Sequence, residues 1–198
     1  MKFYESGDNR KPVIFLFPGT CCLYSSFDHV LDGLHSYFYT VAVSYDGFDP
    51  NEKTEFYSME DECEKIEQEI RTKYGGRIKA AYGCSLGGSF VSLLIQRKRI
   101  HIDHGIIGSS DMDEAGSFMA KLQSSIIVPI MYKMVHTGKL PKFTQNKINE
   151  ADESRKKLID GFVNMFGIDK GGSPWITKQS VYNQFYSDLV TKVQHGID

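Results

Sequence analysis

The sequence of 198 residues lacks an excess of either charge and lacks a long apolar run. Lysine and arginine number 23 against 25 aspartate and glutamate residues, which gives a net charge of −2. Such a balance provides no overall basic field of the kind that holds nucleic acid or an anionic membrane surface. The longest apolar run, residues 126–132, contains Pro129 and falls far short of the roughly 20 residues that cross a bilayer. We therefore expect no nucleic-acid partner and no membrane span.

Cysteine is scarce, and the N-terminus lacks an export signal. The four cysteines, at positions 21, 22, 63 and 84, show neither CxxC spacing nor a disulfide-dense pattern. We expect free thiols in a reducing compartment. Residues 1–13 carry charges where a secretory signal needs an apolar segment. The expected location is therefore cytoplasmic.

The sequence also lacks the motifs that hold a cofactor or a metal ion. The glycines around residue 85 follow neither the G-x-G-x-x-G nor the G-K-[ST] pattern of phosphate-binding loops. His101 and His104 have HxxH spacing, but we expect them at the start of a strand, where residues three apart point to opposite faces. We therefore expect no cofactor and no metal site.

What the sequence does contain is an alternation of short apolar runs and longer polar stretches. Continuous β-branched and aromatic runs predict strands buried on both faces, over residues 13–17, 39–45, 78–82 and 102–107. Amphipathic spacing predicts helices between them, over residues 25–38, 59–74 and 89–96. This order predicts an α/β fold with three layers, αβα, in which helices cover a mostly parallel central sheet.

The strand pattern disappears from residue 112 to about residue 180. Helical stretches are expected there, over roughly residues 115–136 and 146–166. We interpret residues 112–180 as a helical lid inserted into a core of residues 1–111 and 181–198. No repeat or flexible linker interrupts the chain, so we expect a single domain.

Gly83, Ser85 and Gly87 carry the most chemical information, because the string GCSLGG contains the pattern G-x-S-x-G. This pattern marks a sharp turn from a buried strand into a helix, and here it joins the strand over 78–82 to the helix over 89–96. The turn would hold the Ser85 hydroxyl at the carboxyl end of the sheet, beside helix amides that favour negative charge. A plain tight turn is the competing interpretation, and we favour a nucleophile.

A serine that attacks an acyl group also needs N–H donors where the tetrahedral oxyanion forms. The backbone N–H of Leu86, directly after the serine, is one expected donor. The loop FPGTC at residues 17–21 would supply the other, from Thr20 or alternatively from Cys21. Taken alone, Pro-Gly-Thr is an ordinary loop. Its place in the chain relative to the serine turn favours an oxyanion hole.

The strings FLFPGT, YDGF at residues 45–48 and GCSLGG, in that order, resemble the α/β-hydrolase family over roughly residues 10–111. The helices that follow resemble the lid of that family. The resemblance implies a serine hydrolase that acts on an ester or another acyl substrate, as esterases, lipases and peptidases do. It also implies that Ser85 is the nucleophile and that Thr20 and Leu86 form the oxyanion hole, with an acid and then a histidine later in the chain.

The chain departs from the family at its C-terminal end. In the family the acid usually follows the strand after the lid, and the histidine follows one more strand. This sequence ends at Asp198, shortly after a helical stretch over 181–193 that should lead into those strands. The resemblance therefore implies a chain truncated before the last two strands, with a helix and both triad partners missing.

Two residues are candidates to replace the missing partners. Asp111 follows the strand over 102–107 and is expected at the carboxyl end of the sheet as the acid, whereas a helix N-cap is the competing interpretation. His136 ends a predicted lid helix and would reach over the site as the base, whereas a solvated histidine is the competing interpretation. His101 and His104 begin a strand whose opposite end lies beside the serine, so we expect them outside the site.

Two functions fit these observations. The first is an active serine hydrolase that works through Ser85 on a small acyl or ester substrate. The second is a catalytically inactive remnant that retains the serine turn and pocket but lacks the triad Asp and His. Truncation would also leave the strand over 102–107 as an open parallel edge, which favours self-association. We therefore expect a homodimer through the open sheet edge.

Overall fold

A five-stranded sheet forms the centre of the computed structural model, which describes residues 1–110, 114–141, 152–168 and 170–193. Its strands lie in the order β1-β3-β2-β4-β5, with β1 antiparallel to β3 and all other neighbours parallel. Their bounds are Lys2–Ser6 for β1, Val13–Phe17 for β2, Tyr39–Ser44 for β3, Arg77–Cys84 for β4 and His101–Gly108 for β5. The parallel strands β2 to β5 are those that the apolar runs predicted.

The sequence analysis did not predict β1, a short strand that mixes polar and aromatic residues. Its aromatic side chains pack against residues that lie later in the chain. The ring of Phe3 lies edge-on to Phe15 at 6.1 Å, and the ring of Tyr4 stacks on Tyr24 at 3.6 Å. Because the fold supplies these partners, the local pattern alone does not predict the strand.

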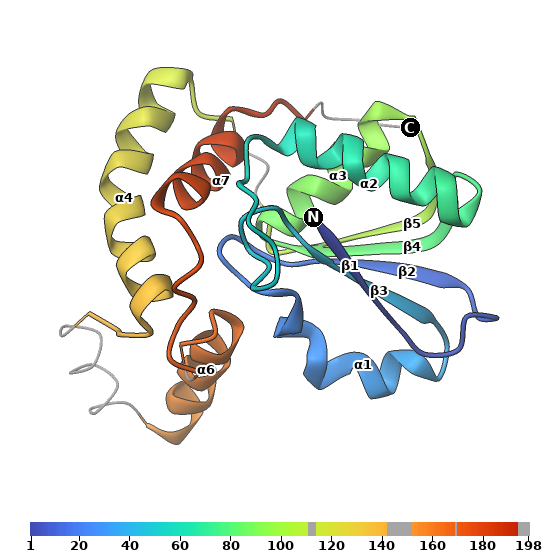
Figure 1. The fold of residues 1–198 in the computed structure, drawn as a ribbon, viewed down its shortest axis with the longest axis horizontal. Helices are drawn as coiled ribbons and strands as arrows, with labels where there is room; N and C mark the ends of the chain where they lie inside the picture. The colour runs from blue at the N-terminus through green and yellow to red at the C-terminus, as the bar shows by residue number, and fades with distance from the viewer. Residues whose placement is uncertain (111–113, 142–151, 169, 194–198) are drawn as a thin grey trace.

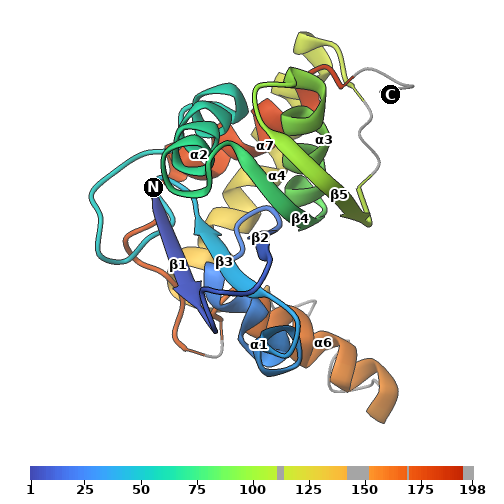
Figure 2. The same cartoon turned by 90° about the vertical axis from the view of Figure 1, so that its right-hand side faces the viewer.

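Helices cover both faces of the sheet, as Figure 2 shows. The helices α2 and α3 pack on one face, and α1 packs on the other after the short helix η1. Their bounds are Tyr24–Phe27 for η1, Asp28–His35 for α1, Met59–Tyr74 for α2 and Leu86–Arg97 for α3. This is the three-layer αβα arrangement that the alternation of strands and helices predicted.

The apolar run of β2 supplies side chains to both layers of the core. Alternate side chains of a strand point to opposite faces. Phe15 and Phe17 belong to the large core cluster that includes residues of α2 and α3, whereas Ile14 and Leu16 belong to a smaller cluster with Phe27 beside α1. A strand buried in this way needs apolar residues at every position, which explains the continuous run.

The helix α2 begins and ends at the signals in its sequence. The Ser58 side chain accepts a hydrogen bond of 3.1 Å from the Asp61 N–H and so caps the first turn. Gly75 ends the helix with φ of 65°, a left-handed conformation that glycine adopts without strain. The helix predicted over residues 59–74 is therefore confirmed with these bounds.

In the described part of the chain, three helices follow β5: α4 (Ser117–Thr137), α6 (Glu153–Met165) and α7 (Lys178–Val190). Figure 1 shows them beside the carboxyl ends of the parallel strands, with α4 packed along α7. The helix α6 falls within the predicted stretch 146–166, and α4 matches the predicted stretch 115–136 to within two residues at each end. Among the described residues, no helix has the length and apolar character needed to cross a bilayer.

The strand β5 forms an open edge of the sheet. It pairs with β4 on one side, and no described strand lies on its other side. Ile106 and Ile107 are 47 % and 41 % exposed on this edge. Ile107 lies close to Gly88 of α3, and since side chains alternate, Ile106 points to the opposite face. The edge expected from the sequence is therefore present and carries an exposed apolar residue on each face.

Candidate active site

Ser85 occupies the sharp turn between β4 and α3. Its backbone has φ of 54° and ψ of −126°, a conformation that L-residues rarely adopt. Its N–H donates to the carbonyl of Gly108 at 2.9 Å, and its own carbonyl accepts from the Gly88 N–H at 2.7 Å. The residue is exposed, and its side chain makes no capping hydrogen bond to α3. The strain costs roughly 1–3 kcal/mol, and it holds the hydroxyl out at the carboxyl end of the sheet.

Glycine is required on both sides of Ser85 because backbone segments cross there at close range. A Cβ atom on Gly83 would overlap the carbonyl of Gly87, and a Cβ atom on Gly87 would overlap the carbonyl of Phe17. Backbone atoms held in a sheet and a helix have no room to move aside. The two glycines of G-x-S-x-G therefore have a direct steric explanation in this fold.

The loop after β2 lies directly against the serine turn. A Cβ atom placed on Gly19 would lie 3.3 Å from the carbonyl oxygen of Cys84 and 3.6 Å from the Cβ of Ser85. The hydroxyl of Tyr45, which is fully buried, supports this loop by donating to the carbonyl of Pro18 at 3.2 Å. The two segments predicted to supply oxyanion donors are therefore neighbours.

Two backbone N–H groups at this junction, those of Thr20 and Leu86, have no acceptor among the described residues. Leu86 is the first residue of α3, where helix N–H groups lack an intrahelical partner. Cys21, the alternative donor, uses its N–H in a 2.9 Å hydrogen bond to Oε1 of Gln184 in α7. The geometry therefore favours Thr20 over Cys21 as the second donor.

Gln184 contacts the loop after β2, and the sequence analysis did not select it. It is fully buried in α7, and its amide oxygen holds the Cys21 N–H across a long sequence separation. A single glutamine in a helical stretch carries no motif, so no local signal could have identified it. The contact shows that α7, near the end of the described chain, holds the loop after β2.

We expect Gln184→Ala to lower the free energy of unfolding by about 1–3 kcal/mol, because it leaves the buried Cys21 N–H without an acceptor. Urea unfolding followed by circular dichroism measures this loss. The matched control is Gln179→Ala in the same helix, where the side chain is exposed and bonds Asn183 on the surface. If Gln179→Ala destabilised the protein as much as Gln184→Ala does, the loss could not be assigned to the hydrogen bond between Cys21 and Gln184.

The predicted acid and base remain predictions. Asp111 lies outside the described residues. His136 is near the end of α4, where its Nδ1 lies 3.3 Å from the carbonyl oxygen of Ile176 and its ring packs on Tyr132 at 4.9 Å. No hydrogen bond joins its ring to Ser85 in the described residues. These contacts place His136 beside the segment that leads into α7.

The structure places two other histidines, His101 and His35, away from the serine turn or in hydrogen bonds with other residues. His101 begins β5, whereas Gly108 at the opposite end of that strand bonds Ser85, so the structure places His101 away from the site as expected. His35 is engaged with Ser6 and Thr40. Among the described residues, no group of three His, Cys, Asp or Glu side chains is arranged to hold a metal ion.

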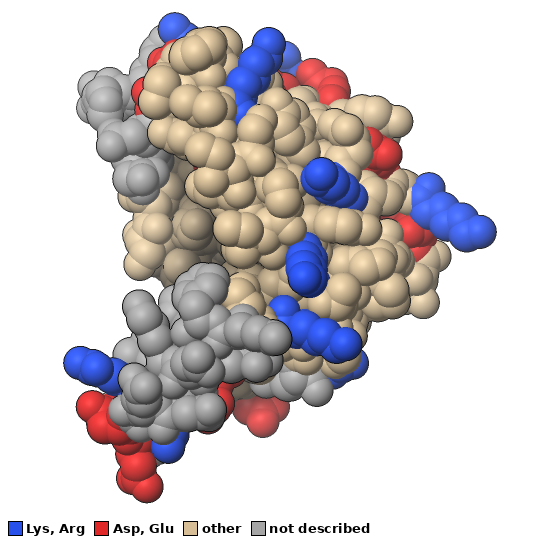
Figure 3. Space-filling view, turned by 90° about the vertical axis from the view of Figure 1, so that its left-hand side faces the viewer, with Lys and Arg blue, Asp and Glu red and all other residues tan. Residues whose placement is uncertain are grey.

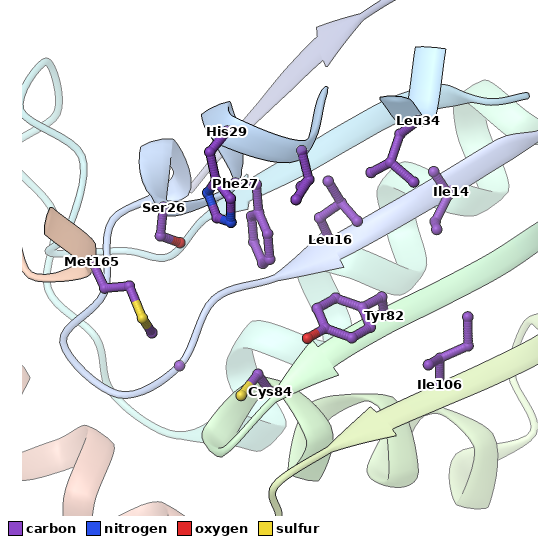
Figure 4. Close-up of a pocket in the computed structure, with 12 residues that line it drawn as sticks. Ile14, Leu16, Ser26, Phe27, His29, Leu34, Tyr82, Cys84, Ile106 and Met165 are labelled. Atoms are coloured by element: carbon purple, nitrogen blue, oxygen red, sulfur yellow. The ribbon is translucent and has the colours of Figure 1, made fainter. Parts of the chain in front are cut away.

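An apolar cavity of about 410 Å³ lies between α1 and the sheet, close to the serine turn. Figure 4 shows it between Phe27 and Leu34 on one side and Tyr82 and Ile106 on the other. Ser85 itself does not line the cavity. Two of its neighbours do: Cys84, which precedes it in the chain, and Gly19 in the loop after β2. The cavity therefore extends from the candidate site along the face of the sheet.

His29 lines the same cavity from the first turn of α1, and Ser26 lies next to it in Figure 4. The sequence analysis did not select His29, because the resemblance places the histidine after Ser85 in the chain and His29 precedes it. Its position near Gly19 makes it a second candidate base beside His136.

The two buried cysteines of the loop after β2, Cys21 and Cys22, are not competing nucleophiles. All four are free thiols, as expected from the sequence. Burial raises the pKa of Cys22 to about 12, and burial also raises the pKa of Cys21. Because the thiolate is the reactive form, these thiols are poor nucleophiles at neutral pH. The exposed hydroxyl of Ser85 remains the candidate.

A buried charge cluster follows β3, at the same edge of the sheet as Ser85. Glu62 is fully buried and accepts hydrogen bonds from the Asp46 N–H at 3.0 Å and from Lys65 at 2.8 Å. Asp46 accepts from Lys65 and from the α-amino group of Met1. Since amines inside the fold already pair with these carboxylates, we assign them a structural role rather than that of the triad acid.

Glu62 predicts how the stability of the protein depends on pH. Burial raises the pKa of its carboxyl from 4.5 to about 7, although the hydrogen bond from Lys65 opposes the rise. Between these two pH values the native state retains a proton that the unfolded chain has lost, so the free energy of unfolding falls as pH rises. The fall amounts to about 3 kcal/mol at most, at about 1.4 kcal/mol per pKa unit.

We expect Glu62→Gln to lack this fall, because glutamine carries no titrating proton. Urea unfolding of both proteins across this pH range measures the difference. Asp46 does not titrate in this pH range. Burial raises the pKa of its carboxyl, but the hydrogen bonds from Lys65 and Met1 outweigh burial and hold this pKa below its ordinary value of 3.8. Parallel stability curves for the two proteins would show that Glu62 does not titrate in this range.

No protein-family model and no curated protein matches the chain, but many solved structures do. An α/β-hydrolase family protein from Desulfitobacterium hafniense matches with a TM-score of 0.73 and 15 % identity, over 96 % of this chain and 72 % of that protein. A thermophilic esterase from Thermogutta terrifontis matches with a TM-score of 0.66 and 15 % identity, over 95 % and 66 % of the two chains. The enol-lactonase from Burkholderia xenovorans has a TM-score of 0.64 and 11 % identity, over 96 % and 69 %.

These likenesses establish the fold. The chain has the α/β-hydrolase fold, as its three sequence strings implied. It spans 66 % to 72 % of the length of these three proteins. The truncation inferred from the sequence, the division into core and lid, and the roles of the site residues stay predictions.

Proposed function

We propose that the chain is a serine hydrolase of the α/β-hydrolase type that attacks an ester or another acyl substrate through Ser85. The observation that carries the proposal is the strained backbone of Ser85 at the unpaired N-terminus of α3, held against the loop after β2. Backbone strain of this kind persists only where contacts with the surrounding structure hold the residue in place, and such residues are common at active sites. The hydrolase neighbours named above support the reaction class.

In the proposed reaction, Ser85 Oγ forms a bond to the acyl carbon, and its proton passes to a base. The carbonyl electron pair moves onto oxygen, and the N–H groups of Thr20 and Leu86 donate hydrogen bonds to this oxyanion. Return of the proton expels the alcohol, and water then releases the acid from Ser85. We propose His136 as the base and Asp111 as its acid, with His29 as the competing base. The apolar cavity favours a substrate with an apolar acyl group.

A second function is supported by a separate observation. No described histidine or carboxylate is hydrogen-bonded to the Ser85 side chain, although an activated serine needs a base within about 3 Å. The competing proposal is therefore a catalytically inactive protein that retains the serine turn and the cavity. The two proposals differ in whether the serine of the folded chain reacts.

Intact mass after exposure to a fluorophosphonate probe separates these functions. Mass gain in the wild type and none in Ser85→Ala would support the hydrolase, and His136→Ala and His29→Ala would then identify the base. Folded wild-type protein that gains no mass would instead support the inactive protein. Equal mass gain in both proteins would place the reactive group elsewhere.

We further propose a homodimer formed by the open edge of β5, in a cytoplasmic protein whose thiols stay reduced. Two copies of an edge strand pair about a two-fold axis, and this pairing would cover Ile106 and Ile107. Light scattering after gel filtration is expected to show a dimer for the wild type and a monomer for Ile106→Lys. A wild type that stays monomeric at high concentration would contradict the edge dimer.

A further inference from the structure

The helix α4 has two apolar faces, and α7 covers one of them. The covered face includes the buried Ser124 and Val128, which line a groove with Tyr182 of α7. The other face carries large side chains with exposures from 39 % for Ile127 to 79 % for Phe118. We call this set the outer row of α4: Phe118, Met119, Leu122, Ile126, Ile127 and Ile130.

The outer row is contiguous. Four of its members, Phe118, Leu122, Ile126 and Ile130, recur at every fourth residue, so each lies one turn from the next on the helix surface. At 1.5 Å per residue the row extends for about 18 Å along α4. Scattered exposed apolar residues are ordinary on a protein surface, whereas a continuous row of this length indicates a surface that binds something.

Two lysines of α4 flank members of this row in the sequence, and a third lysine lies at the start of α7. The helix α4 contains Lys121 and Lys133 and no aspartate or glutamate. Lys178, at the start of α7, lines a groove with Ser125 and Pro129 of α4. All three lysines are exposed, and none forms an ion pair with a described residue. Figure 3 shows the same face, where basic side chains stand among uncharged ones and acidic side chains lie towards the margins.

This charge pattern distinguishes between two partners for the row. In a symmetric dimer built on α4, the lysines of both copies would meet in one interface, where like charges repel. An anionic bilayer would instead attract each amine by about 1 kcal/mol near its surface, and its acyl chains would receive the apolar side chains. The net charge of −2 does not oppose this, since the field of distant charges is screened beyond about 10 Å.

We propose that the outer row of α4 and the three lysines form a surface that binds anionic phospholipid bilayers. The helix lies in the plane of the interface, with the outer row at the boundary between headgroups and acyl chains. This is a peripheral contact, and it does not depend on the reactivity of Ser85.

Co-sedimentation with vesicles tests the proposal. The wild type is expected to sediment with phosphatidylcholine vesicles that contain phosphatidylserine, to bind pure phosphatidylcholine weakly, and to dissociate as salt is raised. Ile126→Glu places a charge in the middle of the row, on a side chain that is 62 % exposed, and should weaken binding at least tenfold without unfolding the protein. Lys121→Ser with Lys133→Ser should remove the preference for phosphatidylserine.

The matched control is Tyr57→Glu, because Tyr57 is 66 % exposed and lies outside α4. It is expected to bind vesicles like the wild type, and circular dichroism should show all variants folded. The proposal is overturned if the wild type sediments with neither type of vesicle, or if Ile126→Glu binds vesicles as well as Tyr57→Glu does. Light scattering that shows a dimer abolished by Ile126→Glu, without vesicle binding, would identify a second copy as the occupant.

Discussion

Ser85→Gly is expected to lose all labelling by a fluorophosphonate probe and, at the same time, to raise the free energy of unfolding by about 1 kcal/mol. The two effects have separate causes. Labelling is lost because the hydroxyl is removed. Stability rises because glycine adopts a positive φ such as the 54° of Ser85 without strain, although part of the gain is offset by the entropy that glycine loses on folding.

Ser85→Ala separates these two causes. It also removes the hydroxyl, but its Cβ retains the strain, so it should lose labelling without the gain in stability. Intact mass measures the labelling, and urea unfolding measures the stability. Glycine and alanine variants of equal stability would show that the turn stores no strain. Wild-type protein that is folded yet unlabelled would favour the inactive alternative, whatever the stability of the variants.

Gly87→Ala is expected to have the largest effect on stability, a loss of about 3 kcal/mol or more, because its Cβ would overlap the carbonyl of Phe17. The overlap involves two backbone segments, the start of α3 and the end of β2, so relief requires the helix to move off the sheet. Such a movement would also displace Ser85 from the loop after β2. We therefore expect whatever labelling the folded variant retains to be slower than in the wild type.

The matched control for this change is Gly33→Ala in α1. A Cβ on Gly33 meets no atom within 4 Å, so alanine adds no clash there. Because alanine is a better helix former than glycine, this variant should gain about 0.5–1 kcal/mol. Thermal unfolding of both variants measures the contrast. A tolerated Gly87→Ala would mean that the turn is looser than the described contacts indicate.

The sequence predicted the sharp turn at Ser85, whereas it did not predict the contacts that support this turn. The pattern G-x-S-x-G and the apolar strand before it are local, so Ser85 and Leu86 could be selected without the fold. Thr20 required the order of motifs along the chain, and the structure then favoured it over Cys21 through the bond to Gln184. Gln184 and His29 carry no local signal, and only their neighbours in space give them importance.

By itself the sequence determined the parallel strands and the helices that cover them, and it predicted the position of the turn at Ser85. Apolar periodicity, the Ser58 cap and the Gly75 stop depend on residues close together in the chain, so they can be read before the chain is folded. The tertiary structure decided which elements meet. It set the pairing of β1 with β3, the hydrogen bond from the loop after β2 to α7, and the face of α4 that stays uncovered. These features depend on contacts between residues far apart in the sequence, which no local pattern encodes.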